Sequence, residues 1–176
     1  MAYRIEQDLI GSKEIPANAY YGIQTARAAE NFNVSRHLVH PELIKALAVV
    51  KQAAAETNMS LGLLSPDISQ AICQAAGEVA DGKLGEHFIV DALQGGAGTS
   101  TNMNVNEVIA NRAIEILGGV KGDYSRIHPL DHVNLSQSTN DVYPTALRIA
   151  AIRLLAPLSG SCALLQGALQ AKEADF

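Results

Sequence analysis

The sequence has 176 residues, a net charge of -5 and 48% hydrophobic residues, a composition typical of a globular protein. The negative charge argues against nonspecific binding to nucleic acid, which requires a basic surface. Charges occur in Met1–Asp8 where a signal peptide needs an apolar run, and we find no apolar stretch of the ~20 residues that span a membrane. We therefore expect a cytoplasmic protein with no nucleic-acid or membrane partner.

The first half of the sequence predicts short extended segments followed by helices. Residues 1–22 contain no alternation long enough for a confident strand, and we expect irregular or extended chain there. Residues 24–32 predict a short helix. A longer helix is expected after His40, because Pro41 suits the first turn and Glu42 suits the positive helix end. Its apolar positions recur at helical spacing: Leu43, Leu47, Val50 and Ala54.

Two further helices are predicted between residues 65 and 118. Ser65–Asp67 supplies a capping residue, a proline and an acid at a helix start, and Gly82 closes that helix. One face of it is apolar, with Ile68, Ile72, Cys73, Ala76 and Val79. The segment 99–117 predicts another helix, which Gly118 ends.

The last predicted element is a helix that runs from Asp141 to the end of the chain. A helix of ~35 residues would be ~50 Å long, more than the preceding residues can cover. Its apolar stripe over 147–169 therefore requires other helices as neighbours. Pro157 is expected to kink it or interrupt its hydrogen bonds. Cys73 and Cys162 lie far apart in helical patterns and are predicted to be small buried apolar residues, without a disulfide or metal.

A glycine-rich segment, Gln94–Asn104, precedes the helix that starts near residue 99. Three glycines in four residues allow the backbone to approach a ligand closely, and hydroxyl and amide side chains follow at the helix start. Such a start can bind an anion, because its first N–H groups lack partners. The segment lacks the lysine of a phosphate-binding loop and the preceding strand of a dinucleotide site. By composition alone, a structural turn before a helix is the simpler interpretation.

A second polar segment, Asp131–Asp141, precedes the last helix. The simpler interpretation is that Ser138, Thr139 or Asn140 caps the helix. Capping explains one of these residues well and three consecutive ones poorly. Together they could bind a carboxylate with neutral donors, which suits a site where negative charge grows during a reaction.

At these residues the sequence resembles the aspartase and class II fumarase superfamily, and the similarity extends in order through essentially the whole chain. The matching blocks are Gly96-Ala97-Gly98-Thr99-Ser100-x-Asn102-Met103-Asn104-x-Asn106-Glu107-Val108, Ser138-Thr139-Asn140-Asp141, Asp8-Leu9-x-Gly11, Pro16-x-x-Ala19-Tyr20-Tyr21-Gly22-x-Gln24-Thr25-x-Arg27-Ala28 and Asn31-Phe32.

Two details favour the aspartase branch and one favours fumarase. The block Gly95–Ser100 resembles aspartases, where fumarases typically have Thr-Gly-Ser-Gly-Thr-Gln, and His132 stands where fumarases usually have a second Asp. His128-Pro129 instead resembles the secondary dicarboxylate site of fumarases. The alternatives to an aspartase are a class II fumarase, which hydrates fumarate to malate, and a noncatalytic structural or ligand-binding relative.

The resemblance implies a reversible conversion of L-aspartate to fumarate and ammonia without an organic cofactor; the sequence does not establish whether a divalent metal activates it. By resemblance, Thr99, Ser138 and Thr139 would hold the substrate carboxylate that gains charge, and Asn140 would lie near the departing amine. The serine loop that supplies the family's base, Gly-Ser-Ser-x-Met-Pro-x-Lys-x-Asn-Pro, does not occur in this sequence. We therefore assign no catalytic base and expect the chain alone to be inactive.

The remaining candidate residues have simpler interpretations beside the functional ones. Ser100 adjoins Thr99 in the same segment. Arg27 is the best candidate for a cation near the site, and an ion pair is at least as good an interpretation. His132 and His128 lie near the second segment, but a lone histidine is more often a structural hydrogen-bonding group. Glu107 could simply brace the helix that follows the glycines. We find no metal-ligand spacing.

The fold expected from these patterns and from the resemblance is mainly α. A small helical amino-terminal domain, 1–140, precedes the first long helix, 141–176, of a central helical-bundle domain that would be truncated here. In the superfamily that bundle is shared by a homotetramer, and each active site draws segments from three subunits. The substrate partner would be a small dicarboxylate or amino acid. We expect the exposed stripe of the last helix to favour association or aggregation.

Overall fold

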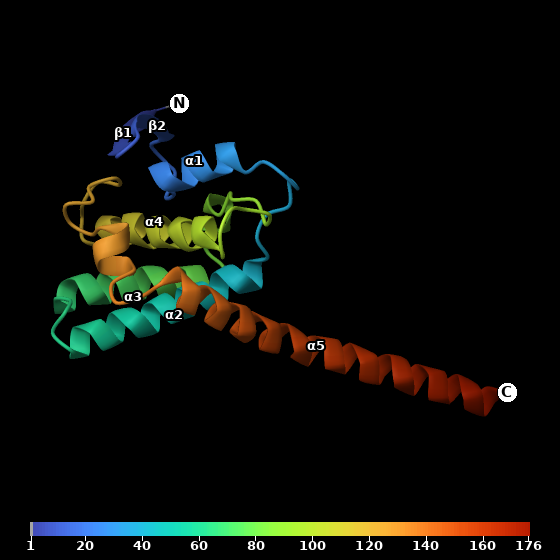
Figure 1. Ribbon diagram of the computed structural model, residues 1–176. Coiled ribbons are helices and arrows are strands. Elements are labelled where there is room, and N and C mark those ends of the chain that lie inside the picture. The colour runs from blue at the N-terminus through green and yellow to red at the C-terminus, as the bar shows by residue number, and fades with distance from the viewer. Residues whose placement is uncertain (1) are drawn as a thin grey trace.

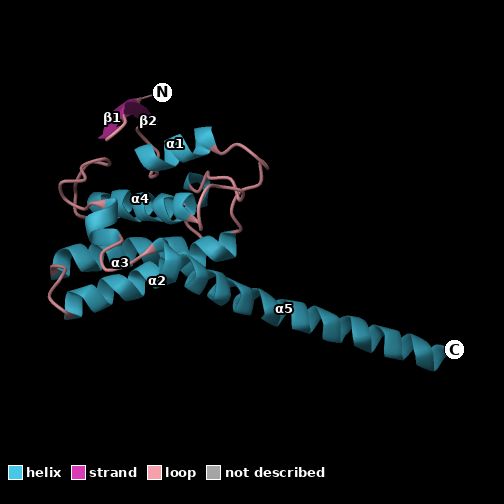
Figure 2. Ribbon diagram, in the orientation of Figure 1, coloured by secondary structure: helices cyan, strands magenta, loops and turns pink. Residues whose placement is uncertain are grey.

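The computed structural model describes residues 2–176, and these are mainly helical, as the sequence predicts (Figures 1 and 2). In chain order the regular elements are β1 (Tyr3–Asp8), β2 (Gly11–Pro16), α1 (Ile23–Asn31), α2 (Pro41–Ser60), α3 (Pro66–Ala80), α4 (Thr99–Ile116) and α5 (Thr139–Asp175). A 3₁₀ turn, η1 (Gly85–His87), precedes α4, and a π-helical turn, η2 (Pro129–Val133), precedes α5.

The amino-terminal segment forms a β-hairpin, so the chain over much of 1–22 is extended, one of the two states expected there, but its pairing into strands was not predicted. Strands β1 and β2 pair antiparallel, with Asp8 opposite Gly11. The Asp8 carboxylate accepts hydrogen bonds from the backbone N–H groups of Ile10 (2.9 Å) and Gly11 (3.1 Å). The connecting residues Leu9-Ile10 lack the Asn-Gly or Asp-Gly signature of a tight hairpin, which explains why the pattern gives little indication of it.

The hydrophobic core lies between α2, α3 and α4, and α1 packs on the opposite side of α4 (Figure 1). Leu47 of α2, Ile72 of α3 and Ile109 of α4 are fully buried. The apolar faces predicted for these helices therefore meet in one core. At 25 cal/mol per Å² of apolar surface, burying each such side chain stabilises the fold by about 1.5–3 kcal/mol.

The helix boundaries agree closely with the sequence signals. α1 to α4 each begin within a residue of the expected start, and Gly82 and Gly118 follow α3 and α4 with φ of +84° and +72°. The caps differ in detail. Ser65 is at the N-cap of α3, but its hydroxyl makes no capping bond. At α2 it is the His40 Nδ1 atom that accepts a hydrogen bond, from the Glu42 N–H group (3.2 Å).

Helix α5 starts at Thr139, two residues before the expected position, and projects away from the rest of the chain (Figure 1). Only its first turns pack on the core, where Val142, Ala146 and Ala150 are buried. Every residue from 151 onward is exposed. The helix continues through Pro157, and Figure 1 shows no sharp kink along α5, so of the two effects expected of Pro157 only the missing backbone hydrogen bond remains, since proline has no N–H group.

The exposure and composition of α5 change two sequence predictions. Among the described residues, α5 is the one helix that is long and apolar enough to cross a membrane, by length and composition alone. Its most apolar stretch of 18 residues has a mean hydropathy of 1.4, and 6% of that stretch is buried. The prediction that no stretch reaches that length is therefore wrong on this measure, although the same pattern occurs in helices that are covered by other helices. Cys162 is exposed rather than buried, because it lies on the projecting part of α5. Cys73 is half-buried against the core.

Candidate functional site

The start of α4 is fixed by glycine geometry and by one glutamine. Gly98, the N-cap residue, has φ +86°, and a Cβ atom there would lie 2.3 Å from the Tyr143 ring. This close approach brings the start of α4 against the first turns of α5. The Gln94 side chain accepts from the Thr101 N–H group (2.8 Å) and donates to the Thr101 hydroxyl (2.7 Å), which closes the glycine-rich loop. Thr99 is left exposed at the helix start.

The start of α5 is a capping box. The Ser138 hydroxyl oxygen accepts from the Asn140 N–H group (3.2 Å), and the Asp141 carboxylate accepts from the Ser138 N–H group (3.2 Å). The capping interpretation is thus confirmed for Ser138. Capping uses a lone pair of the hydroxyl oxygen, so the hydroxyl proton remains free to donate to a ligand. Capping and anion binding are therefore compatible at the same residue.

A hydrogen bond joins the two polar segments. Asn102, one turn into α4, donates from Nδ2 to the Thr139 hydroxyl oxygen (3.0 Å) and to the Asn134 Oδ1 atom (3.1 Å). Asn102 is buried, and Thr139 is half-buried as the first residue of α5. The Thr139 hydroxyl accepts this bond and donates to no acceptor among the described residues, so its own proton is also available for an anion. The structure therefore brings together the two helix starts that the sequence singled out.

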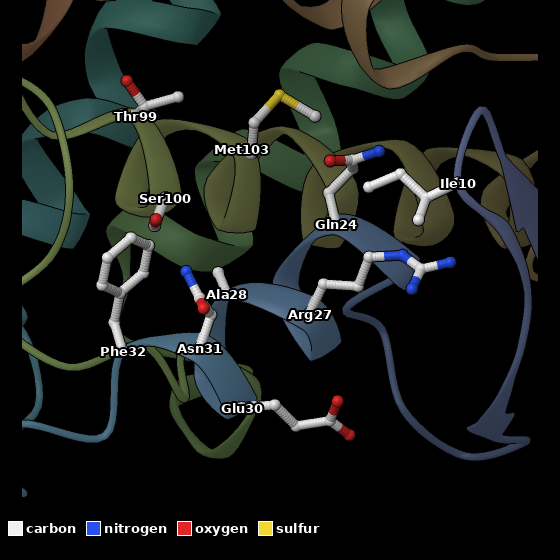
Figure 3. Close-up of a pocket in the computed structure, with 10 residues that line it drawn as sticks. All are labelled: Ile10, Gln24, Arg27, Ala28, Glu30, Asn31, Phe32, Thr99, Ser100 and Met103. Carbon is white, nitrogen blue, oxygen red and sulfur yellow. The ribbon is translucent and has the colours of Figure 1, made fainter.

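The candidate residues do not all line one cavity. Thr99, Ser100 and Arg27 line an open cavity of about 620 Å³ between α1 and the start of α4 (Figure 3). Asn140 lines a different cavity of about 320 Å³ against the glycine-rich loop. Ser138 is exposed and lines neither of these two cavities. Both cavities are open to solvent, and the candidate residues are divided between them.

Arg27 is engaged in an ion pair and is not a free cation. Its guanidinium donates to both carboxylate oxygens of Asp8, at 2.8 and 3.0 Å, and to the Gly11 carbonyl at 3.0 Å. The hydrogen bond from Arg27 lowers the pKa of Asp8. Of the two interpretations of Arg27, the structure favours the ion pair, which here ties α1 to the hairpin.

His128 and His132 both use their Nδ1 atoms in local backbone hydrogen bonds. His128 Nδ1 caps η2 by accepting from the N–H groups of Leu130 (3.3 Å) and Asp131 (3.2 Å). His132 Nδ1 accepts from the His128 N–H group (2.8 Å), and burial lowers the pKa of His132. His128 also lines a cavity of about 710 Å³ beside the first one. These contacts support the structural interpretation of both residues.

Glu107 is buried and braces α1 from α4. Its carboxylate accepts from the N–H groups of Gly22 (2.8 Å), Gln24 (2.9 Å) and Thr25 (3.1 Å), and from the Thr25 hydroxyl (2.5 Å). Burial raises the pKa of Glu107, and these hydrogen bonds oppose that shift. The carboxylate thus supplies the acceptor that the start of α1 needs, since Gly22 at its N-cap has no side chain.

A buried polar network that the sequence patterns did not indicate lies beneath the α5 start. Lys51 of α2 is fully buried, and its Nζ atom donates to Asn134 Oδ1 (2.7 Å) and to Gln137 Oε1 (2.9 Å). Its spacing was the available signal, because Lys51 follows the buried Leu43 and Leu47 in steps of four residues. The part of the chain that the structure describes contains no cluster of three or more His, Cys, Asp or Glu side chains able to hold a metal.

Comparison with known proteins identifies the family. A family model described as Lyase matches residues 11–176. A Bacillus sp. protein named aspartate ammonia-lyase is 54% identical over 98% of the chain, and a Brucella suis protein named fumarate hydratase class II is 49% identical over 99%. The chain covers 37% and 38% of these two proteins, little more than a third of their length. A crystal structure titled fumarate lyase:delta crystallin from Brucella melitensis bound to cobalt has a TM-score of 0.97 and 51% identity, with 99% of this chain and 38% of that chain covered.

Proposed function

The chain belongs to this lyase family, which contains proteins named aspartate ammonia-lyase and class II fumarate hydratase, and on that premise we propose that the full-length protein converts L-aspartate reversibly to fumarate and ammonia. The observation that carries this proposal is the hydrogen bond between Asn102 and Thr139, which joins two polar helix starts around neutral donors. The block Gly95–Ser100 and His132 further favour the ammonia-lyase branch.

In this proposal Thr99, Ser138 and Thr139 bind the carboxylate that gains charge, and Asn140 lies near the departing amine. Removal of the proton beside that carboxylate produces an aci-carboxylate dianion, and the C–N bond then breaks to release ammonia and form the double bond of fumarate. Neutral hydroxyl donors that are fixed before the reaction stabilise the dianion more than the substrate, which lowers the barrier. The protons of Ser138 and Thr139 are available for this role, because their oxygens accept bonds from the protein and neither hydroxyl donates to an acceptor among the described residues.

The base that takes the proton would come from residues outside this sequence, so we propose that residues 1–176 contribute binding without acid–base chemistry. Residues 1–140 would form the amino-terminal domain, and α5 would be the first helix of a bundle domain in a homotetramer. We propose that this reaction needs no organic cofactor and takes place in the cytoplasm.

A class II fumarase is the second candidate, because His128-Pro129 is present and a fumarate hydratase of Brucella suis is 49% identical. The two reactions are distinguished by assaying the full-length protein for ultraviolet absorbance of fumarate with L-aspartate and, separately, with malate. The proposal expects fumarate from L-aspartate. Activity on malate alone would contradict it and support the fumarase, and activity on neither would favour a noncatalytic relative.

A further inference from the structure

The largest fully buried side chain of the described residues is an ionisable one, Lys51 of α2. Placing an ammonium group in the interior costs several kcal/mol unless hydrogen bonds replace water. No carboxylate contacts it here. Its partners are the amide oxygens of Asn134 (2.7 Å) and Gln137 (2.9 Å), and both belong to the segment that leads directly into Ser138.

The hydrogen bonds around Lys51 support the shape of this segment. Asn134 Oδ1 accepts from Lys51 and also from the amides of Asn102 (3.1 Å) and Asn106 (3.2 Å). A carbonyl oxygen has two lone pairs, so three donors compete for it, and the charged donor forms the strongest bond. Ser136, between the two residues that Lys51 holds, has φ +60°, a conformation that a non-glycine residue keeps only when its surroundings enforce it.

The same network continues to the proposed carboxylate-binding residues. Asn102 shares the Asn134 oxygen with Lys51 and donates its other proton to the Thr139 hydroxyl (3.0 Å). Asn102 Oδ1 and Asn106 Oδ1 are buried in this network without a partner. Carbonyl oxygens without donors create a negative electrostatic potential around them, which favours a cation in this part of the interior.

We propose that Lys51 is a positioning residue of the lyase site: its ammonium group holds the segment 134–137, fixes Ser138 and Thr139 in the geometry that binds the substrate carboxylate, and adds positive potential beneath them. This inference rests on the proposed function, because it concerns the same carboxylate. Lys51 does not touch the substrate and acts through Asn134, Gln137 and Asn102.

The charge of Lys51 couples the site to pH. Burial lowers the pKa of Lys51 to about 7, and the Asp141 carboxylate at the start of α5 opposes this shift. The groups of α4 and of the segment 134–137 that join the network are neutral amides, so Asp141 is the one charged group of the described residues whose field acts on Lys51. A bound anion favours the ammonium form, so loss of the proton weakens anion binding by the same factor. Affinity for a dicarboxylate should therefore fall as the pH rises through about 7.

The test measures binding of succinate, a dicarboxylate that cannot react, to the full-length protein by calorimetry between about pH 6 and about pH 9. Lys51→Met removes the charge and keeps the length of the side chain. Lys45→Met is the matched control, because Lys45 lies on the same helix and pairs only with the nearby Glu42 (2.7 Å). We expect wild type and Lys45→Met to lose affinity about tenfold or more over this range. Lys51→Met should bind about tenfold or more weakly at the acidic end and lose this pH dependence.

If Lys51 had a purely structural role, Lys51→Met would keep the wild-type pH dependence of succinate binding. In Lys51→Met the Asn134 oxygen keeps two amide donors, whereas the Gln137 oxygen loses its donor, so the Tm should fall but circular dichroism should still show a folded protein. Gln137→Leu provides a second variant that retains the lysine. Loss of the Gln137 acceptor should shift the midpoint of the pH dependence below that of wild type.

The outcomes separate this inference from the proposed function. A folded Lys51→Met protein with wild-type affinity and wild-type pH dependence would overturn the role of Lys51 while leaving the lyase proposal intact. An unshifted midpoint in Gln137→Leu would overturn it as well. A wild-type protein that neither binds succinate nor produces fumarate would overturn the proposed function, and the inference with it.

Discussion

The hydroxyl groups at the start of α5 hold the fold with their oxygens, and the proposed function assigns their protons to a carboxylate. The Ser138 and Thr139 oxygens accept hydrogen bonds that hold the fold, from the Asn140 N–H group and the Asn102 amide. Neither hydroxyl donates to a protein acceptor in the part of the chain that the structure describes. Capping and carboxylate binding therefore do not exclude each other, because capping uses a lone pair of the oxygen and binding would use the hydroxyl proton.

Substitution of these hydroxyls separates their two roles experimentally. In the full-length protein, Ser138→Ala or Thr139→Ala should lower kcat/KM for the proposed reaction by about ten- to a thousandfold, as loss of one oxyanion donor does. Ser138→Ala should also destabilise the protein by about 1 kcal/mol through loss of the cap, measured by urea unfolding. Thr145→Ala, an exposed threonine of the same helix, is the control and should change neither quantity. Unchanged kinetics in both variants would leave only the capping role.

The fold also depends on the buried carboxylate of Glu107. Glu107→Gln replaces one acceptor oxygen by an NH₂ group that faces the donors of Gly22, Gln24 and Thr25. We expect a loss of about 1–3 kcal/mol in the free energy of unfolding, because buried donors lose their acceptor. The exposed Glu30→Gln substitution is the control. Equal stability of wild type and Glu107→Gln by urea unfolding would contradict the bracing role.

At the scale of elements, one carboxylate secures the connection between α1 and α2. Asp91 accepts from the N–H groups of Val34 (3.1 Å), Ser35 (2.8 Å), Arg36 (2.8 Å) and Leu93 (2.7 Å), and from the Ser35 hydroxyl (2.5 Å). The hydrogen bond from the Ser35 hydroxyl, reinforced by these backbone N–H groups, holds the pKa of Asp91 well below its usual range.

The low pKa of Asp91 has a consequence for acid stability. Because the folded-state pKa lies below the unfolded value of about 3.9, ionised Asp91 stabilises the fold above that pH, and this contribution is lost as the pH falls through the folded-state pKa. Asp91→Asn should therefore lower the Tm near neutral pH, and the difference from wild type should shrink in acid. The exposed Asp81→Asn serves as the control, and scanning calorimetry at several pH values measures the effect. A Tm difference that stays constant with pH would contradict it.

The helices could be predicted because their signals are local, whereas the polar network could not. Pro41, Ser65–Asp67 and Gly118 mark helix ends by backbone chemistry that needs no tertiary contact, and the structure confirms those ends. The hairpin at Leu9-Ile10 lacks such turn chemistry. The partners of Lys51 lie 83 and 86 residues away in sequence, so their meeting depends on how α2 packs against η2 and α5.

The candidate site divides in the same way. The two polar helix starts were identified from their residue types, and their contact in space is confirmed by the Asn102–Thr139 bond. The partner of Arg27 was not predictable, because Asp8 reaches it only through the hairpin that the sequence did not reveal. Whether Thr99, Ser138, Thr139 and Asn140 bind substrate stays a prediction that the kinetics above would test.

At the scale of the whole molecule, α5 is the least covered element. Its stripe of apolar side chains is exposed in this chain and includes Leu154 at 42%, Leu158 at 57% and Leu165 at 62% exposure. Contiguous exposed apolar surface of this kind favours association with other helices. We expect the isolated chain to self-associate in a concentration-dependent manner, as measured by sedimentation velocity.

Charges placed on the stripe should suppress this association without unfolding the rest of the chain. Leu158→Glu with Leu165→Glu inserts two carboxylates into the apolar face, and the stability of the core should not change, since every residue from 151 onward is exposed. Ala156→Glu with Ala163→Glu is the matched control, because each position is rotated by about 200° around the helix from the replaced leucine and the charge is the same. The control should associate like wild type, whereas the leucine variant should sediment as a monomer with an unchanged Tm. Equal association of the two double variants would show that net charge, and not the apolar face of α5, governs assembly.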